Sequence, residues 1–264
     1  MVQKLGLALS LPTIKTVAAS DLENLYSLDF DGSNDYVDFG SGSTFTPNSS
    51  GSNRGFSLSF WIKTSSTRKV IMNKYNGGNY EYMIKADTGG AIAFELYADD
   101  DNNIRQILTT DTSAGSFINV ADGSWHHVVC TFNLSGHANS QTIWIDGVEF
   151  DDANGGANYT SLGTWTNVIN TGADFLFADT SGGYQGLLDE VSMWDDELGS
   201  SEVASIYNSG TPTDLTGEGN LIGWWRNGDP TGTGAFPTIV DQSTNSNDGT
   251  MTNMASGDIV TDVP

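Results

Sequence analysis

Apolar and polar residues alternate with a period of two along most of the chain from residue 26 onward. Such alternation is typical of β-strands that bury one face. Clusters of Asn, Gly, Asp and Ser separate the alternating runs, and Asp146-Gly147 is a hairpin turn signal. The pattern predicts an all-β, two-sheet antiparallel jelly-roll sandwich. The predicted strands span residues 56–62, 80–84, 92–96, 125–132, 143–148, 175–178 and 187–194.

One segment has a helical pattern. Residues 200–208 place Val203, Ile206 and Tyr207 on one face, and Gly210 is the predicted stop. This helix is too short to be stable alone, so we expect it to pack on the sandwich.

The remaining C-terminal part, 211–264, begins with a turn-rich linker and contains two β-like runs, 221–225 and 238–240. These runs are too short to build their own core. We therefore predict a sandwich over 26–210, completed by C-terminal strands from 211–264, and preceded by an arm over 1–25.

The composition narrows the classes of protein and ligand. Asp and Glu number 33 against 10 Lys and Arg, which gives a net charge of −23, and 31 residues are Gly. Of the acidic residues 25 are Asp, a residue that favours turns over helix interiors. A helical bundle is excluded. Nucleic acid and an anionic membrane surface are disfavoured as partners, because binding to either requires many cationic side chains.

Two further observations limit the chemistry. Cys130 is the chain's one cysteine, so an intrachain disulfide and a cysteine-based zinc site are excluded, and its apolar run predicts a buried, inert thiol. The sequence has no apolar run near the ~20 residues of a membrane span, so no membrane insertion is expected.

The N-terminal arm has a strand pattern with one apolar face. Pro12 and Lys15 interrupt its apolar stretch, so we interpret it as an ordered arm and not as an export signal. It is mildly basic in an acidic chain, and strand addition on an acidic neighbour would bury its leucines. The neighbour would be a different protein or a second copy, which predicts a homo-oligomer or larger assembly. The alternative is that the arm folds back as an edge strand. The leucines are Leu5, Leu7, Leu9 and Leu11.

Five ordered motifs between residues 26 and 210 resemble laminin-G-like domains of the concanavalin A-like lectin/glucanase superfamily. The resemblance implies a concanavalin A-like jelly roll. It leaves function open, because this fold carries lectins, adhesins, hydrolases and scaffolds. The motifs span residues 28–37, 56–63, 125–129, 143–147 and 186–194.

The order of the motifs differs from that of many relatives. A block with Trp224, Asp229 and the turn 241–249 is similar to one that usually precedes the first motif, so the chain resembles a circular permutation. Chains of this order with an acidic surface resemble structural proteins of marine tailed phages. That resemblance implies a virion surface location, with other virion structural proteins as partners of the N-terminal arm. A secreted or cell-surface location is the alternative.

Enzymatic activity is not predicted. The glucanase branch uses a Glu-x-Asp-x-x-Glu strand that presents two carboxylates on one face, and this sequence has no such string. His126 and His127 are adjacent on a predicted strand, so their side chains face opposite ways and share neither a metal nor a proton relay.

Calcium is the candidate cofactor. In the run 187–194, Asp189 and Glu190 alternate between the two faces, so one carboxylate lies on the buried face or at its edge. A buried carboxylate requires donors or a cation. Two interpretations stay open: Asp189 caps backbone N–H groups of a nearby loop, or Asp189 and the Asp31 loop hold calcium, as relatives often do near these motifs.

Sugar binding requires an exposed aromatic ring beside hydrogen-bonding groups. Four aromatic residues have amide or carboxylate neighbours in predicted loops: Tyr80, Tyr159, Trp165 and Tyr184. The sequence thus predicts a non-enzymatic virion surface protein (a decoration, fibre or tail-associated protein) whose lectin-like module binds host glycans. A coat or cement protein without a ligand is the structural alternative, and a secreted glycan hydrolase is less favoured.

Overall fold

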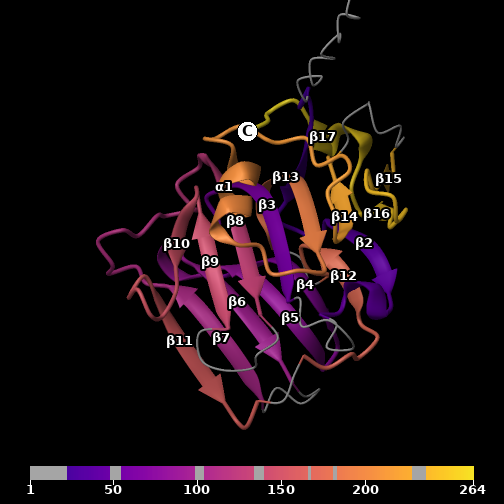
Figure 1. The fold of residues 1–264 in the computed structure, drawn as a ribbon. Helices are drawn as coiled ribbons and strands as arrows, with labels where there is room; N and C mark the ends of the chain where they lie inside the picture. Colours follow the sequence, from indigo (N-terminus) through magenta and orange to yellow (C-terminus); the bar gives the residue numbers. More distant parts are fainter. Residues whose placement is uncertain are drawn as a thin grey trace, which may run out of the picture.

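The computed structural model describes residues 23–47, 55–98, 104–133, 140–165, 168–180, 183–227 and 236–264. Within these segments two antiparallel β-sheets face each other, and one α-helix lies on the outer side of one sheet (Figure 1). The prediction of an all-β, two-sheet sandwich with one short helix is confirmed. No helix in these segments is long and apolar enough to cross a membrane.

The first sheet, sheet A, has eight strands among the described residues. Strand β14 pairs with β13 beside the main path. In spatial order the path runs through β10 (Val148–Phe150), β9 (Gln141–Ile145), β8 (Trp125–Phe132), β3 (Phe56–Thr64), β13 (Gln185–Trp194), β1 (Ser27–Asp31) and β17 (Ile259–Val260), with β14 at Leu221–Trp225.

The second sheet, sheet B, has nine strands within the described segments. Short 3₁₀ turns η1 (Ser43–Phe45), η2 (Thr88–Gly90) and η4 (Ser256–Asp258) lie in the connections. In spatial order the strands are β11 (Ala157–Leu162), β7 (Arg105–Thr110), β6 (Ile92–Tyr97), β5 (Asn79–Ala86), β4 (Lys69–Asn76), β12 (Asp174–Phe177), β2 (Tyr36–Ser41), β16 (Gly249–Thr252) and β15 (Thr238–Ile239).

The core fills the space between the two sheets with alternate side chains of their strands. Phe60 of β3 and Phe94 of β6 are fully buried, as the alternation of their runs predicts. Cys130 is also fully buried, and this burial raises the pKa of its thiol. The prediction of an inert buried thiol agrees with that environment.

A second apolar cluster lies between sheet A and helix α1 (Ser200–Tyr207). The helix buries Val203 and Ile206, which confirms the predicted face. The chain leaves the helix at Asn208, whose φ of 46° is left-handed, two residues before the predicted stop at Gly210. The cluster consists of Val129, Trp144, Trp194, Leu198, Val203, Ile206, Leu215 and Trp224.

The predicted hairpin turn joins β9 and β10. Asp146 and Gly147 have φ values of 51° and 76°, the two positive angles that a type I′ turn requires. The Asp146 carboxylate also accepts a hydrogen bond from the His127 backbone N–H at 2.9 Å and contacts the His126 ring at 2.7 Å. This turn therefore fixes the end of β8 as well as its own hairpin.

Strands from the C-terminal part pair with strands of both sheets. β14 pairs with β13 and β17 with β1 in sheet A, whereas β16 pairs with β2 in sheet B. Trp225 of β14 is fully buried among Phe39, Phe175 and Phe177. These contacts place residues after 220 inside the sandwich core.

A β-bulge interrupts β13 beside its two carboxylates. The register with β3 shifts by one residue between Asp189 and Ser192, and Glu190 has a φ of 45°. Leu188 and Val191 consequently both face the core, although strict alternation would place them on opposite faces. The sequence-based assignment of one carboxylate to each face is therefore wrong at the bulge, and both carboxylates are buried.

Candidate functional site

The four aromatic residues predicted from the sequence lie in different surroundings. Tyr80 is partly exposed and stacks against two other tyrosines. Tyr159 packs against the core, and the Trp165 ring meets Phe132 at a centroid distance of 6.0 Å. Tyr184 is a core residue whose hydroxyl donates to the Leu187 carbonyl, so it presents no face to solvent. All four lie in described segments, and no ring contact joins any two of them.

The two predicted calcium ligands lie apart. Asp31 pairs with Gln185 across the strands, and Asp189 is four residues farther along β13, about 13 Å away. The exposed Asp31 carboxylate accepts the Ser33 backbone N–H at 2.7 Å, which closes a local turn. Among the described residues no group of three or more His, Cys, Asp or Glu side chains is arranged to hold a metal. The structure thus does not support one ion shared by Asp31 and Asp189.

Asp189 is instead held by hydrogen-bond donors in the protein interior. Its carboxylate accepts from the Asn24 side-chain amide at 2.8 Å and from the Glu190 backbone N–H at 2.8 Å. Burial and the neighbouring Glu190 carboxylate raise the pKa of Asp189 well above its usual value. Asp189 thus accepts hydrogen bonds from protein donors, as in the first of the two interpretations of its burial. The donors are the Asn24 side chain and the backbone of the bulge itself.

Arg226 compensates the second carboxylate of the bulge. Its Nε donates to Glu190 at 3.0 Å, and the Trp224 indole N–H donates to the other Glu190 oxygen at 2.7 Å. Arg226 also donates to the backbone carbonyl of Glu23 at 2.7 Å. This Arg226 cluster (Asn24, Asp189, Glu190, Trp224 and Arg226) joins the first described residues, strand β13 and the C-terminal part of the chain.

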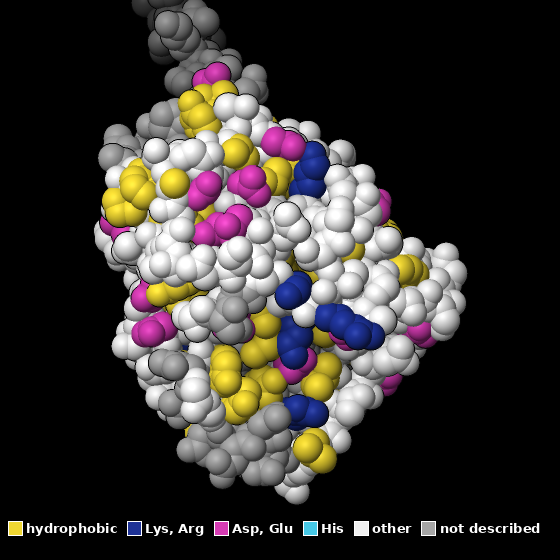
Figure 2. Space-filling view, turned by 180° about the vertical axis from the view of Figure 1, so that it is seen from behind, with side chains coloured by type: hydrophobic (Ala, Val, Ile, Leu, Met, Phe, Trp, Pro, Cys, Tyr) yellow, Lys and Arg dark blue, Asp and Glu magenta, His cyan; other side chains and the backbone are white. Residues whose placement is uncertain are grey.

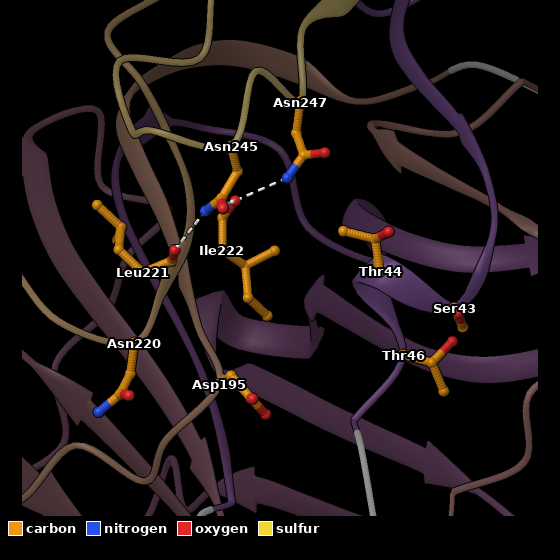
Figure 3. A pocket seen from close by; sticks show the side chains of 9 residues that line it. All are labelled: Ser43, Thr44, Thr46, Asp195, Asn220, Leu221, Ile222, Asn245 and Asn247. Carbon is orange, nitrogen blue, oxygen red and sulfur yellow. Dashed lines mark hydrogen bonds between the residues drawn. The ribbon is translucent and has the colours of Figure 1, made fainter.

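A polar cavity lies elsewhere, between η1 and the loop after β15. This polar cleft has a volume of about 580 Å³. Figure 3 shows the η1 segment on one side, with Asn245 and Asn247 on the other. Seven of the nine lining side chains carry hydroxyl, amide or carboxylate groups. The lining residues are Ser43, Thr44, Thr46, Asp195, Asn220, Leu221, Ile222, Asn245 and Asn247.

Hydrogen bonds orient the two amides of the polar cleft. The Asn245 side-chain N–H donates to the Leu221 carbonyl at 2.7 Å, and the Asn247 side-chain N–H donates to the Ile222 carbonyl at 2.7 Å (Figure 3). Both donors are thereby engaged by β14, so these bonds fix how the amide carbonyl oxygens are placed. Carbonyl oxygens act as acceptors. This side of the cleft is thus preorganised to receive a ligand's hydrogen-bond donors.

Asp241 holds the loop that carries these amides. Its carboxylate accepts the backbone N–H groups of Trp224, Ser243 and Asn247 at 2.8–2.9 Å. The Ser243 hydroxyl donates to the same carboxylate at 2.8 Å. In the sequence the turn 241–249 indicates the order of the fold. The same turn contains Asn245 and Asn247, which have no aromatic ring and so lack that sequence signal of sugar binding.

Two glutamates lie on neighbouring strands of sheet B, and their partners show whether they could form a catalytic carboxylate pair. The register of β5 and β6 brings Glu81 and Glu95 to neighbouring strands. Glu81 is fully buried and accepts from Lys74 at 2.8 Å, from the Thr46 hydroxyl at 2.6 Å and from the Thr171 backbone at 2.8 Å. Glu95 pairs with Lys85 at 2.6 Å. Carboxylates so paired are structural, because a general acid requires a proton and access to a ligand.

Comparison with known proteins places this geometry in a family. A family profile described as the concanavalin A-like lectin/glucanases superfamily matches residues 31–204. Neuronal pentraxin-1 of Rattus norvegicus is 26% identical over 178 residues, which are 64% of this chain and 36% of that protein. Neuronal pentraxin-2 of Cavia porcellus is 24% identical over 181 residues, 65% of this chain and 37% of that protein. The chain therefore spans little more than a third of these relatives.

Solved structures agree at the level of the fold. A putative carbohydrate binding protein from Bacteroides ovatus superposes with a TM-score of 0.54 at 14% identity, covering 89% of this chain and 60% of that one. A heptameric pentraxin from Limulus polyphemus gives 0.44 at 14% identity over 70% and 82% of the two chains. With its sandwich and matched motifs, the chain belongs to the concanavalin A-like lectin/glucanases superfamily as a laminin-G-like, lectin-type domain.

Proposed function

We propose that the protein is a non-catalytic carbohydrate-binding module and that the polar cleft holds the sugar. The observation that carries the proposal is the lining, which combines oriented amides and the Asp195 carboxylate with the hydroxyls of Ser43 and Thr44. Sugar hydroxyls both donate and accept hydrogen bonds, so a cleft with both kinds of group suits them. The printed description of the Bacteroides ovatus protein is consistent with this function.

The charge pairing of sheet B supports binding without catalysis. Hydrolysis of a glycosidic bond requires one carboxyl group that gives a proton and a second that acts as nucleophile or base. Lys74 and Lys85 pair with Glu81 and Glu95, the two neighbouring glutamates on that sheet. A lectin needs neither role. The alternative without a ligand, a coat or cement protein, predicts that the polar cleft stays empty.

A double variant tests the polar cleft. Ser43→Ala with Thr44→Val removes two exposed hydroxyls while keeping the size of the side chains nearly constant. We expect binding of the best ligand from a glycan array to weaken by about tenfold or more, since each lost hydrogen bond contributes about 1 kcal/mol. Titration calorimetry measures this change.

Thr160→Val is the matched control, because it removes an exposed threonine hydroxyl from β11 at the far edge of sheet B. We expect it to bind as the unaltered protein does. An array without any bound glycan, or equal affinities for the double variant and the control, would contradict the proposed function.

We further propose that the module is displayed on a virion surface and assembles through residues 1–20. The support is the resemblance to phage structural proteins and the leucine pattern of the arm, which lies outside the described residues. Deleting residues 1–20 is expected to leave the melting temperature of the sandwich unchanged while oligomers or particles no longer form. Light scattering and calorimetry measure both. Normal assembly of the shortened chain would contradict this role.

A further inference from the structure

Three tyrosines form a continuous aromatic strip on sheet B. The rings of Tyr75 and Tyr80 stack with a centroid distance of 4.5 Å and an angle of 27°. The Tyr80 ring meets the Tyr97 ring at 4.9 Å. Tyr75 and Tyr80 are partly exposed, whereas Tyr97 is buried beneath them. This tyrosine strip presents ring surface at the end of β4, β5 and β6, the kind of surface on which sugar rings pack.

Charged side chains adjoin the strip on the outer side of sheet B. Tyr97 lies directly opposite Arg105 in the register of β6 and β7. Lys85 Nζ contacts one Glu95 oxygen at 2.6 Å, and the Tyr97 hydroxyl donates to the other. Because both Glu95 oxygens are engaged, the carboxylate holds Lys85 and Tyr97 in place. The Lys85 side chain retains 30% exposure, and an ammonium group has three donors.

The distribution of cations sets this face apart from the rest of the molecule. Figure 2 shows Lys and Arg side chains beside hydrophobic ones on the side opposite to helix α1. Of the seven Lys and Arg residues in the described segments, four lie on strands of sheet B and a fifth directly precedes β4. In a chain with a net charge of −23, such a group of cationic side chains attracts anions locally. These five residues are Arg68, Lys69, Lys74, Lys85 and Arg105. Lys74 is fully buried and paired with Glu81, so the other four carry the attraction at the surface.

We propose that the tyrosine strip and Lys85 form a second binding surface, distinct from the polar cleft, for an acidic polysaccharide. Sugar rings pack on Tyr75 and Tyr80, and carboxylate or sulfate groups bind Lys85, with Arg105 on the neighbouring strand. Single-stranded nucleic acid also combines rings and anions. We disfavour nucleic acid as the ligand, because it carries a phosphate at every nucleotide. This strongly acidic chain offers only a few cations to pair with those charges.

The experiment uses polymers that share one sugar backbone. The full chain is titrated with dextran, carboxymethyl dextran and dextran sulfate in biolayer interferometry at two salt concentrations. We expect binding to at least one anionic dextran, none to dextran itself at the same concentrations, and weaker binding at high salt. The two anionic polymers separate carboxylate from sulfate recognition. Binding of neutral dextran equal to that of both anionic forms would overturn the proposal.

Variants assign the binding to this surface. Tyr80→Ala and Lys85→Gln are each expected to weaken the anionic dextran complex by about tenfold. Lys63→Gln is the matched control, because Lys63 pairs with Asp262 on sheet A at similar exposure, and it is expected to bind normally. Lys85→Gln keeps the test valid if Tyr80→Ala lowers the melting temperature. Normal affinity of Lys85→Gln would overturn the proposal.

Two further measurements distinguish this proposal from sugar binding in the polar cleft and from binding of other polyanions. The Ser43→Ala, Thr44→Val variant is expected to keep full affinity for anionic dextran, so the polar cleft and the tyrosine strip fail or succeed independently. Polyglutamate supplies anions without sugar rings, and oligo-dT supplies anions with bases. We expect both to bind at least tenfold more weakly than the anionic dextran. Equal or tighter binding of either polymer would overturn the assignment to a polysaccharide.

Discussion

A chain that ends at Gly210 is expected to lose cooperative unfolding. The truncation removes β14, β16 and Trp225, which fills the core between Phe39, Phe175 and Phe177. Loss of a buried tryptophan side chain alone costs about 3–5 kcal/mol, against a typical total stability of about 5–15 kcal/mol. Half of β13 and one side of β2 also lose their pairing partners. Calorimetry and near-ultraviolet circular dichroism measure the outcome.

Deletion of residues 1–20 is the control for chain shortening, because it leaves every described contact in place. We expect that chain to unfold in one sharp transition, as the full chain does. A chain ending at Gly210 that melts as sharply, and at a similar temperature, would mean that the C-terminal strands are dispensable for the sandwich.

The second large effect is expected at Arg226. Arg226→Met removes the guanidinium from Glu190 while retaining an apolar side chain of similar length. Glu190 keeps the Trp224 indole donor but loses the guanidinium, the cation that faces its buried carboxylate. Breaking a buried ion pair in this way costs about 3–5 kcal/mol at neutral pH. Urea titration of both proteins measures the difference in the free energy of unfolding.

The loss at Arg226 is expected to depend on pH. The folded-state pKa of Asp189 is raised, so the folded protein retains a proton that the unfolded chain releases above a pH of about 4. Stability therefore falls as pH rises through this range. Arg226 lowers the pKa of Asp189, so its removal raises that pKa further and makes stability fall more steeply with pH. The loss of stability in Arg226→Met should therefore be largest at neutral pH and smaller near pH 4.

Two comparisons isolate the charge effect. Glu190→Gln combined with Arg226→Met also removes the carboxylate charge that faced the guanidinium, and is expected to recover most of the lost stability at neutral pH. Lys63→Met breaks an ion pair whose side chains are 32% and 48% exposed, and its expected cost is below about 1 kcal/mol. A deficit of Arg226→Met that stays constant between pH 4 and 7 would attribute the loss to packing alone.

Several elements were predictable because their signals are local. The strands over 56–62 and 125–132 have regular alternation or β-branched and aromatic runs, and β3 and β8 occupy these positions. The Asp146-Gly147 turn depends on two positive φ angles that these residues tolerate. The face of α1 followed from helical spacing. In each case the necessary information lies within about ten neighbouring residues.

Strands β7 and β11 were missed because tertiary contacts decide their structure. In β7 the inward residues Gln106 and Thr110 are polar, whereas Ile107 faces outward, so the apolar alternation that marks a strand is weak. Gln106 is buried and accepts a hydrogen bond from the Ser140 hydroxyl at 3.3 Å. β11 lies at the sheet edge with mainly exposed side chains, and its sequence has no apolar alternation.

The candidate sites depended even more on long-range packing. The polar cleft combines η1, Asp195, the start of β14 and the 241–249 turn, segments separated by up to about 200 positions in the sequence. Tyr80 has a local signal, an aromatic ring beside an amide, but its neighbour Tyr97 and the ion-pair partner of Lys85 are brought to it only by the pairing of β5 with β6. The bulge at Glu190, which buries both carboxylates, has no sequence signature of its own.

Periodicity, turn residues and composition act locally or as sums over the chain, so they suffice to predict the sandwich class, the helix, the family and the acidic surface. Which polar groups face one another depends instead on the packing of distant segments. Asp189 accepts from Asn24 where a metal was considered, and Asn245 and Asn247 are oriented by the carbonyls of β14. Such pairings depend on strand register and bulges, because a shift of one residue moves a side chain to the other face of its sheet.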